Sequence, residues 1–197
     1  MPTIPLSHRI ILASGSPRRQ QFLKDLLFDF DLELKPIEEN YPPHLQKEEI
    51  TEYLAQLKAS PFEETLQEKE IVITSDTIVW HENKAYGKPK DEAEAFEMLR
   101  SYSGKVHQVI SSVCFTTKKQ QITKSYTTDV FFKPLQDSDI QFYIEHFKPM
   151  DKAGAYGIQE WIGLIGIEKI NGSYFNVVGM PCHLVYETLL SICNQEK

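Results

Sequence analysis

Between Ile10 and Arg19 the chain passes from an apolar run into small hydroxyl residues, one glycine, one proline and two arginines. The apolar residues 10–12 predict a short strand. Ser16 is a favourable N-cap, and Pro17 fits the first position of a helix, where its missing N–H group costs nothing. The segment therefore predicts a strand that leads directly into a helix.

Arg18 and Arg19 then lie in the first helical turn, where the helix macrodipole disfavours each cation by roughly 0.3–1 kcal/mol. A bound anion would offset this cost. Free backbone N–H groups, the Ser14 hydroxyl and two guanidinium groups together suit a phosphate chain. The alternative is an ordinary helix start at the surface with two solvated arginines.

A single acid, Asp76, interrupts the apolar residues 71–80, which otherwise predict a buried strand. An unpaired buried carboxylate is costly, so Asp76 should meet a cation, a metal ion or the mouth of a cleft. The alternative is that Asp76 ends the strand by accepting hydrogen bonds from nearby backbone N–H groups.

Three further charged residues lie in segments with a clear local pattern. Glu39 lies in a loop rich in helix and strand breakers, and Lys58 lies at the end of an amphipathic helix, residues 47–58. Lys88 follows a hairpin that could return it toward Asp76. By pattern alone, Glu39 and Lys58 are ordinary solvated groups.

Four blocks of the sequence, residues 12–19, 54–59, 71–80 and 151–159, resemble the signatures of the Maf (septum-formation) family of nucleoside triphosphate pyrophosphatases. The last block matches the family's most recognisable run residue for residue. The resemblance implies that Asp76 is the catalytic residue and that Glu39 and Asp76 hold a divalent metal ion. Together with the local patterns, including the hairpin that carries Lys88, it predicts that the substrate is contacted by Ser14, Arg18, Arg19, Lys58, Thr77, Lys88 and Gln159.

The resemblance implies hydrolysis of a nucleoside triphosphate between the α and β phosphates, which yields the monophosphate and pyrophosphate. A triphosphate carries concentrated negative charge, so a divalent cation, magnesium or manganese, is expected with it. Whether Asp76 acts as a base or as a metal ligand is open at this point. Two alternatives are a nucleotide sensor without turnover that regulates cell division and a protein-interaction module. The latter leaves the buried acid and the first-turn arginines unexplained.

Three positions vary between the substrate branches of the family, and here they are Arg18, Thr77 and Gln159. This combination resembles the branch that acts on dTTP and UTP. A glutamine amide offers both a donor and an acceptor, so it can pair with the edge of uracil or thymine. The family usually has a glycine after this glutamine. Here Glu160 stands instead, and it could reshape the loop that carries Gln159.

The composition limits the partners and the compartment. A formal net charge of −7 argues against broad binding to nucleic acids or membranes, so phosphate binding must come from a local basic cluster. Three cysteines without CxxC spacing indicate free thiols in a reducing compartment. The N-terminal residues lack a long apolar stretch, and no run is long enough to span a membrane. We expect a cytoplasmic protein that binds a small nucleotide.

Strands and helices follow one another irregularly in the predicted order, which favours an α/β or α+β fold with a mixed sheet. No linker rich in Pro, Gly or Ser divides the chain, so we expect one domain over residues 1–197. The resemblance implies an inosine-triphosphatase-like fold, with an elongated mixed sheet, two lobes and a central cleft, commonly as a homodimer.

Several local predictions concern elements outside these blocks. Residues 28–34 and 165–170 predict strands, and a helix should begin after a cap at Asp137 or Ser138 and bury Phe147. His107 opens a strand, and we expect it to be a structural hydrogen-bonding residue rather than a general base.

Overall fold

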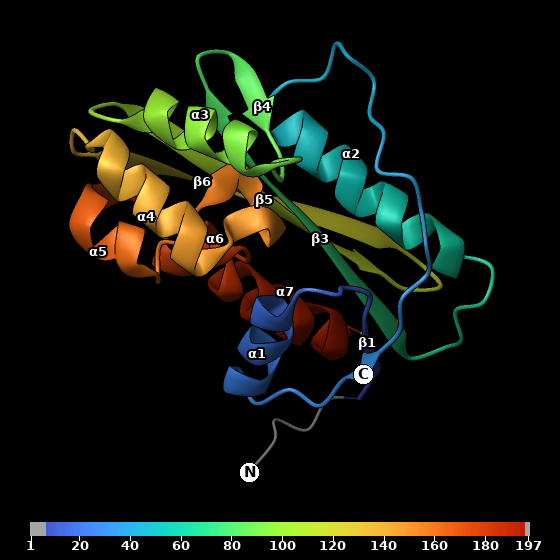
Figure 1. The fold of residues 1–197 in the computed structure, drawn as a ribbon. Coiled ribbons are helices and arrows are strands. Elements are labelled where there is room, and N and C mark those ends of the chain that lie inside the picture. Colours follow the sequence, from blue (N-terminus) through green and yellow to red (C-terminus); the bar gives the residue numbers. More distant parts are fainter. Residues whose placement is uncertain (1–6, 196–197) are drawn as a thin grey trace. The chain divides into compact units, whose positions relative to one another are not determined.

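The computed structural model describes residues 7–195 (Figure 1). The helices are α1 (Pro17–Asp25), α2 (Glu48–Ala59), α3 (Glu92–Tyr102), α4 (Asp137–Phe147), α5 (Trp161–Gly166), α6 (Tyr174–Val178) and α7 (Cys182–Gln195). The strands are β1 (Arg9–Leu12), β2 (Asp31–Leu32), β3 (Glu70–His81), β4 (Lys84–Tyr86), β5 (Val106–Thr116), β6 (Gln121–Phe132) and β7 (Ile167–Asn171). Short 3₁₀ turns occupy Ser60–Phe62, Pro149–Asp151 and Ala153–Ala155.

Within residues 7–195 the strands form one sheet in the order β2-β1-β3-β5-β6-β7, with β4 paired to β3. Strand β1 pairs in parallel with both β2 and β3, whereas β3 pairs with β4 and β6 with β7 in antiparallel register. The sheet is therefore mixed, as predicted.

The chain forms two compact units. Unit 1 contains the chain up to Asp76, the segment Ser111–Tyr126 and the chain from Gly179 onward, and unit 2 contains Thr77–Ile110 and Thr127–Val178. Strands β3, β5 and β6 each pass from one unit to the other. The single domain predicted over residues 1–197 stays a prediction, and its first six and last two residues lie outside the described part of the chain.

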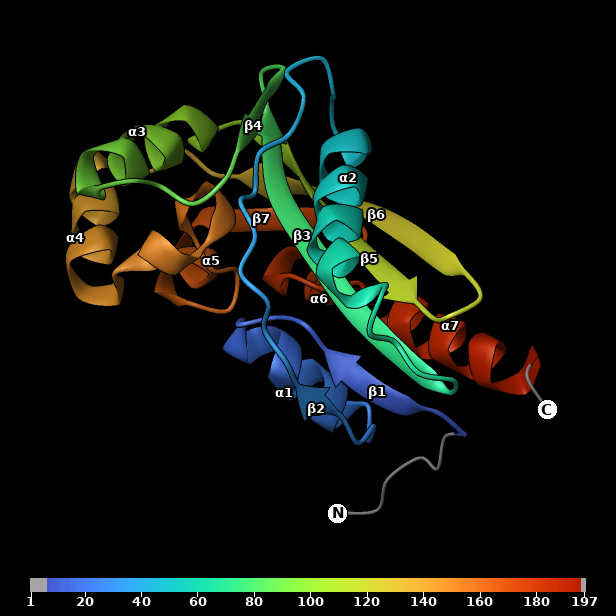
Figure 2. The same cartoon turned by 90° about the vertical axis from the view of Figure 1, so that its right-hand side faces the viewer.

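In unit 1, alternate strand residues pack on opposite faces of the sheet, as the twofold periodicity of a strand requires. One face carries Ile10, Ile71 and Val113, which pack with residues of α1 and α7. On the other face, Cys114 packs against Ala55 of α2 and its neighbour one turn along. Helices α2 and α7 thus cover opposite faces (Figure 2). Because both faces of the sheet are covered here, the sequence of β3 is a nearly continuous run of apolar residues.

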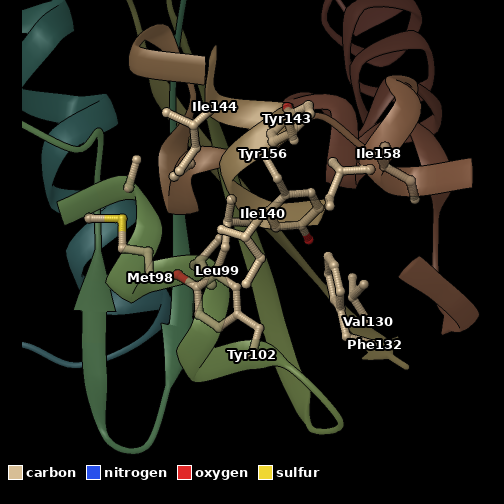
Figure 3. Packing of buried hydrophobic residues seen from close by; sticks show 14 of the residues in the cluster. Met98, Leu99, Tyr102, Val130, Phe132, Ile140, Tyr143, Ile144, Tyr156 and Ile158 are labelled. Atoms are coloured by element: carbon tan, nitrogen blue, oxygen red, sulfur yellow. The ribbon is translucent and has the colours of Figure 1, made fainter. Parts of the chain in front are cut away.

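In unit 2, the core lies between the strands and helices α3 and α4 (Figure 3). Helix α3 begins after Asp91, whose carboxylate accepts the Glu94 N–H at 2.8 Å. The apolar stripe of this helix, which consists of Ala95, Met98, Leu99 and Tyr102, is buried throughout. It packs against residues of β6, of α4 and of the segment before α5, including Val130, Phe132, Ile140, Tyr143, Ile144, Tyr156 and Ile158.

Three local predictions are wrong in detail. The predicted strand 28–34 is reduced to Asp31–Leu32 at the sheet edge, where Leu32 is 49% exposed and gains little by pairing. Helix α4 has Gln136 at its N-cap without a side-chain bond, and Phe147 is exposed. The strand predicted from residue 165 begins only at Ile167, because residues 161–166 form α5.

Candidate active site

The turn that follows β1 has the predicted geometry. Ser16 has extended backbone angles, its hydroxyl accepts the Arg19 N–H at 3.5 Å, and Pro17 occupies the first turn of α1. The Ser16 N–H donates to the hydroxyl of Ser14 at 3.3 Å, and Ser14 is buried. The predicted strand-to-helix turn is confirmed.

The two arginines of this turn have different surroundings. Arg18 is half-buried, whereas the Arg19 guanidinium turns back into unit 1. It donates from Nε to the carbonyl of Gly179 at 2.9 Å and from Nη1 to the carbonyl of Ser75 at 2.7 Å. Burial lowers the pKa of Arg19, but a guanidinium keeps its charge at any pH of interest. Arg19 therefore ties the turn to β3 and to the residues that precede α7.

Strand and helix periodicity together bring Asp76 to Lys58. On β3, Thr74 and Asp76 are two residues apart and face the same side, and on α2, Ala55 and Lys58 are one turn apart. The Thr74 hydroxyl donates to the Ala55 carbonyl at 2.6 Å, and Lys58 Nζ donates to Asp76 Oδ1 at 2.6 Å. The intervening Ser75 faces away from α2.

Lys58 Nζ also lies 2.9 Å from Glu39 Oε2, so one ammonium group contacts two carboxylates. Asp76 is 7% exposed, whereas the Glu39 side chain is 54% exposed. Burial raises the pKa of Asp76 above its ordinary value, although Lys58 and Arg19 act in the opposite direction. The result is a carboxylate of raised proton affinity beside two fixed cations.

These contacts decide two of the alternatives that the sequence left open. Asp76 lies inside β3 and is paired with Lys58, so the alternative that it ends the strand is wrong. Lys58 is not an ordinary solvated lysine, since its side chain is only 17% exposed and holds two acids.

The other predicted substrate residues belong to unit 2. Thr77 is half-buried on β3, and Lys88 is exposed just after β4. The carbonyl of Gly87 accepts the Gly154 N–H at 2.9 Å, which brings the end of the hairpin to the segment that carries Gln159. The approach of Lys88 to Asp76 stays a prediction.

Gly154 is required where it stands. Its φ is +71°, and a Cβ there would lie 2.4 Å from Cγ2 of Val79. No other residue fits without moving the backbone. Gly154 therefore allows the backbone of its segment to pack closely on β3.

Glu160, the residue that departs from the family pattern, is anchored inside unit 2. Its carboxylate accepts a hydrogen bond from the Tyr143 hydroxyl and lies 3.0 Å from Lys152 Nζ. Gln159 beside it is exposed. No sequence pattern identifies Tyr143 or Lys152 as functional residues, because neither periodicity nor spacing links them to Glu160.

His107 has the predicted structural role. It is 2% exposed, and its Nε2 lies 2.7 Å from the Tyr156 hydroxyl. Burial lowers the pKa of His107 to about 3, so the ring is neutral at physiological pH.

Three general observations bear on cofactors and compartment. Within residues 7–195, no cluster of three or more His, Cys, Asp or Glu side chains could by itself bind a metal ion. Cys114, Cys182 and Cys193 are free thiols. Among the helices of the described chain, none has the length and apolar character needed to cross a membrane.

A solved structure has the same fold. The Staphylococcus aureus Ham1 protein aligns with a TM-score of 0.55 over 93% of this chain and 99% of that chain, at 17% sequence identity. The predicted inosine-triphosphatase-like fold with a mixed sheet is confirmed.

The family follows from sequence comparison. A family model described as "Maf-like protein" matches residues 9–192, so the chain belongs to the Maf family. Relatives described as dTTP/UTP pyrophosphatase include one from Christiangramia forsetii, 56% identical over 95% of this chain and 96% of the relative. One from Flavobacterium johnsoniae is 56% identical over 94% of this chain and 95% of the relative. One from Bacteroides fragilis is 49% identical over 92% and 95%.

Proposed function

We propose that this protein hydrolyses dTTP and UTP to the nucleoside monophosphate and pyrophosphate. The relatives described as dTTP/UTP pyrophosphatase support this proposal, because each aligns over more than nine-tenths of both chains. The observation that carries it in the structure is the buried carboxylate of Asp76, held 2.6 Å from Lys58 Nζ. A protein that only binds nucleotides has little need for a buried acid beside a cation.

In the proposed reaction, water attacks the α-phosphorus and the bond to the oxygen bridging to the β-phosphorus breaks. Pyrophosphate leaves, and the proton of the attacking water passes to Asp76. The raised pKa of Asp76 favours this role, because a general base works best when its pKa lies near the working pH. Arg18, Lys58 and Lys88 contact the phosphates, while Ser14 and Arg19 shape the turn that receives them.

The residues present fit a divalent cation. Glu39 and Asp76 bring two hard carboxylate oxygens to one point, within 2.9 Å of Lys58 Nζ. Magnesium and manganese take one or two such carboxylates together with substrate phosphates. Glu39 and Asp76 would hold the ion, which when bound neutralises phosphate charge and lowers the pKa of water.

The base is read by Thr77 and Gln159. The glutamine amide can donate to a carbonyl of uracil or thymine and accept from its N–H group. A site built on such hydrogen bonds rejects a mismatched base strongly, because its polar groups are then left unpaired.

A test is pyrophosphate release with dTTP, UTP, ATP, GTP and CTP in the presence of magnesium or manganese. We expect kcat/KM for dTTP and UTP to exceed the others by about tenfold or more, which equals roughly 1.4 kcal/mol. Chelation should abolish release. Arg18→Ala and Lys88→Ala should weaken all five nucleotides alike, because phosphate contacts carry no base information. A preference for a purine would contradict the base assignment, and tight binding without release would indicate a nucleotide sensor.

The remaining features concern assembly and compartment. The resemblance to the Maf family supports a homodimer, which sedimentation velocity would test. Three free thiols support a cytoplasmic location. The net charge of −7 supports a small nucleotide rather than a nucleic acid as the partner.

A further inference from the structure

A polar cluster that takes no part in the proposed chemistry is enclosed in unit 2. It consists of Tyr143 on α4, Lys152 before the 3₁₀ turn Ala153–Ala155, and Glu160 at the N-cap of α5. Tyr143 is fully buried, and Lys152 is 8% exposed. Charged groups are buried only when they have partners, so the contacts within this cluster define its role.

Glu160 is held from two sides. The Tyr143 hydroxyl donates to its carboxylate, and Lys152 Nζ lies 3.0 Å from its Oε1. Lys152 Nζ also lies 2.7 Å from Oδ1 of Asp151. The Tyr143 hydroxyl in turn accepts the Gly157 N–H at 3.0 Å. One hydroxyl therefore fixes both ends of the short loop 157–160, and Gln159 lies inside that loop.

The side chains of Gln159 and Glu160 both fold back over Gly157. A Cβ on Gly157 would lie 3.0 Å from Gln159 Nε2 and 2.9 Å from Glu160 Cδ. The Glu160 N–H donates to the Gly157 carbonyl at 3.0 Å, which closes the turn. The amide of Gln159 is thus placed by the same glycine and the same turn that Glu160 anchors.

We propose that Glu160, clamped by Tyr143 and Lys152, is a positioning residue that fixes the Gln159 amide and thereby sets the preference for the base. This inference rests on the proposed function, in which Gln159 contacts the base. Lys152 offsets the charge of Glu160, and the tyrosine hydroxyl sets the direction of its carboxylate. The glutamate that departs from the family pattern therefore stabilises the loop shape.

The test compares kcat/KM for dTTP with kcat/KM for dCTP, two substrates that differ only in the base. Tyr143→Phe removes the hydroxyl but keeps the ring, and Glu160→Gln removes the charge. We expect each to lower the dTTP-to-dCTP ratio by about tenfold through a higher KM for dTTP, with kcat for dCTP unchanged. Because Tyr143 is fully buried, Glu160→Gln serves as the second variant if Tyr143→Phe does not fold.

Tyr102→Phe is the matched control. Tyr102 is also a fully buried tyrosine of unit 2, and its hydroxyl has no hydrogen-bond partner among the described residues. This variant should keep the ratio. Gln159→Ala should lower the ratio, and adding Tyr143→Phe to it should cause no further loss, because both changes act through one amide.

Different outcomes would overturn the base contact of Gln159 and the positioning role of Glu160. If Gln159→Ala leaves the ratio unchanged, Gln159 does not read the base, and the proposed function is wrong at this point. If Gln159→Ala lowers the ratio but folded Tyr143→Phe and Glu160→Gln keep it, the base contact stands and the positioning role of Glu160 is overturned.

Discussion

Each of the two units contains a lysine whose ammonium group contacts two carboxylates, yet the surroundings of the two differ. In unit 1, Lys58 Nζ lies 2.6 Å from Asp76 and 2.9 Å from Glu39. Asp76 is fixed in a strand, but Glu39 lies on a loop and is 54% exposed. Lys58 is therefore buried on the side that faces Asp76 and accessible to solvent on the side that faces Glu39.

In unit 2, Lys152 Nζ lies 2.7 Å from Asp151 and 3.0 Å from Glu160. The Lys152 side chain is 9% exposed, and Glu160 has a further partner in the Tyr143 hydroxyl. The cluster is satisfied by its own members, because its donors and acceptors match.

The comparison shows that residue types alone do not separate a reactive site from a structural one. A lysine between two acids can bind an incoming phosphate only if one of its contacts can be given up. The exposed Glu39 allows this at Lys58, whose side chain is 17% exposed. Lys152 also has an exposed partner, since Asp151 is 57% exposed, but the lysine itself is only 9% exposed, and its other acid, Glu160, is also held by the Tyr143 hydroxyl. We expect changes at the first lysine to alter chemistry and changes at the second to alter stability and loop position.

The largest effect is expected for Asp76→Asn. Turnover should fall by about a hundredfold or more, the scale of a lost general base, when pyrophosphate release is measured with dTTP. Because burial raises the pKa of Asp76, its ionised form costs stability as pH rises above the ordinary carboxylate range. The neutral asparagine should therefore melt no lower than wild type at pH 7. Release within threefold of wild type would contradict the catalytic role.

Lys152→Met should lower the free energy of unfolding by about 2 kcal/mol in urea denaturation, because it leaves the partly buried Glu160 without its cation. Lys148→Met is the matched control in the same unit. Lys148 is 64% exposed and pairs with Glu92 at 3.0 Å, so its loss should cost about 1 kcal/mol or less. Equal losses for the two variants would show that the buried cluster contributes no more to stability than an exposed ion pair does.

The smallest effect is expected for Lys58→Gln on the pH dependence of activity. Lys58 lowers the pKa of Asp76, so its removal should raise that pKa further and move the acidic limb of kcat/KM to higher pH. The position of the limb is independent of any loss in phosphate binding, which changes only its height. Lys105→Gln, which removes an exposed partner of Glu82, should leave the limb in place. An unmoved limb in Lys58→Gln would indicate that Asp76 is not the titrating group.

Much of the local structure follows from short-range patterns. Ser16 and Pro17 set the start of α1 through backbone geometry and hydrogen bonding that involve only neighbouring residues. The burial of Asp76 follows from the apolar residues on both sides of it. These predictions held because their physical causes lie within one turn or one strand.

Other elements depend on neighbours distant in the chain. Helix α5 replaces part of a predicted strand, and Gly163 lets it pack directly on the backbone of Ile158, where a Cβ would lie 1.9 Å from the carbonyl oxygen. The apolar residues 162–167 suit a strand or a helix equally well by pattern. Only packing in unit 2 selects between them.

The sequence by itself determined the mixed fold, the turn after β1 and the acid in β3, because periodicity and capping are local. Only the tertiary structure decided that Lys58 meets Asp76, that Arg19 binds backbone carbonyls and that Glu160 is anchored by Tyr143. Those contacts join segments that are distant in the sequence, and no local sequence pattern predicts them. They exist because the sheet fixes which face of each helix opposes which strand.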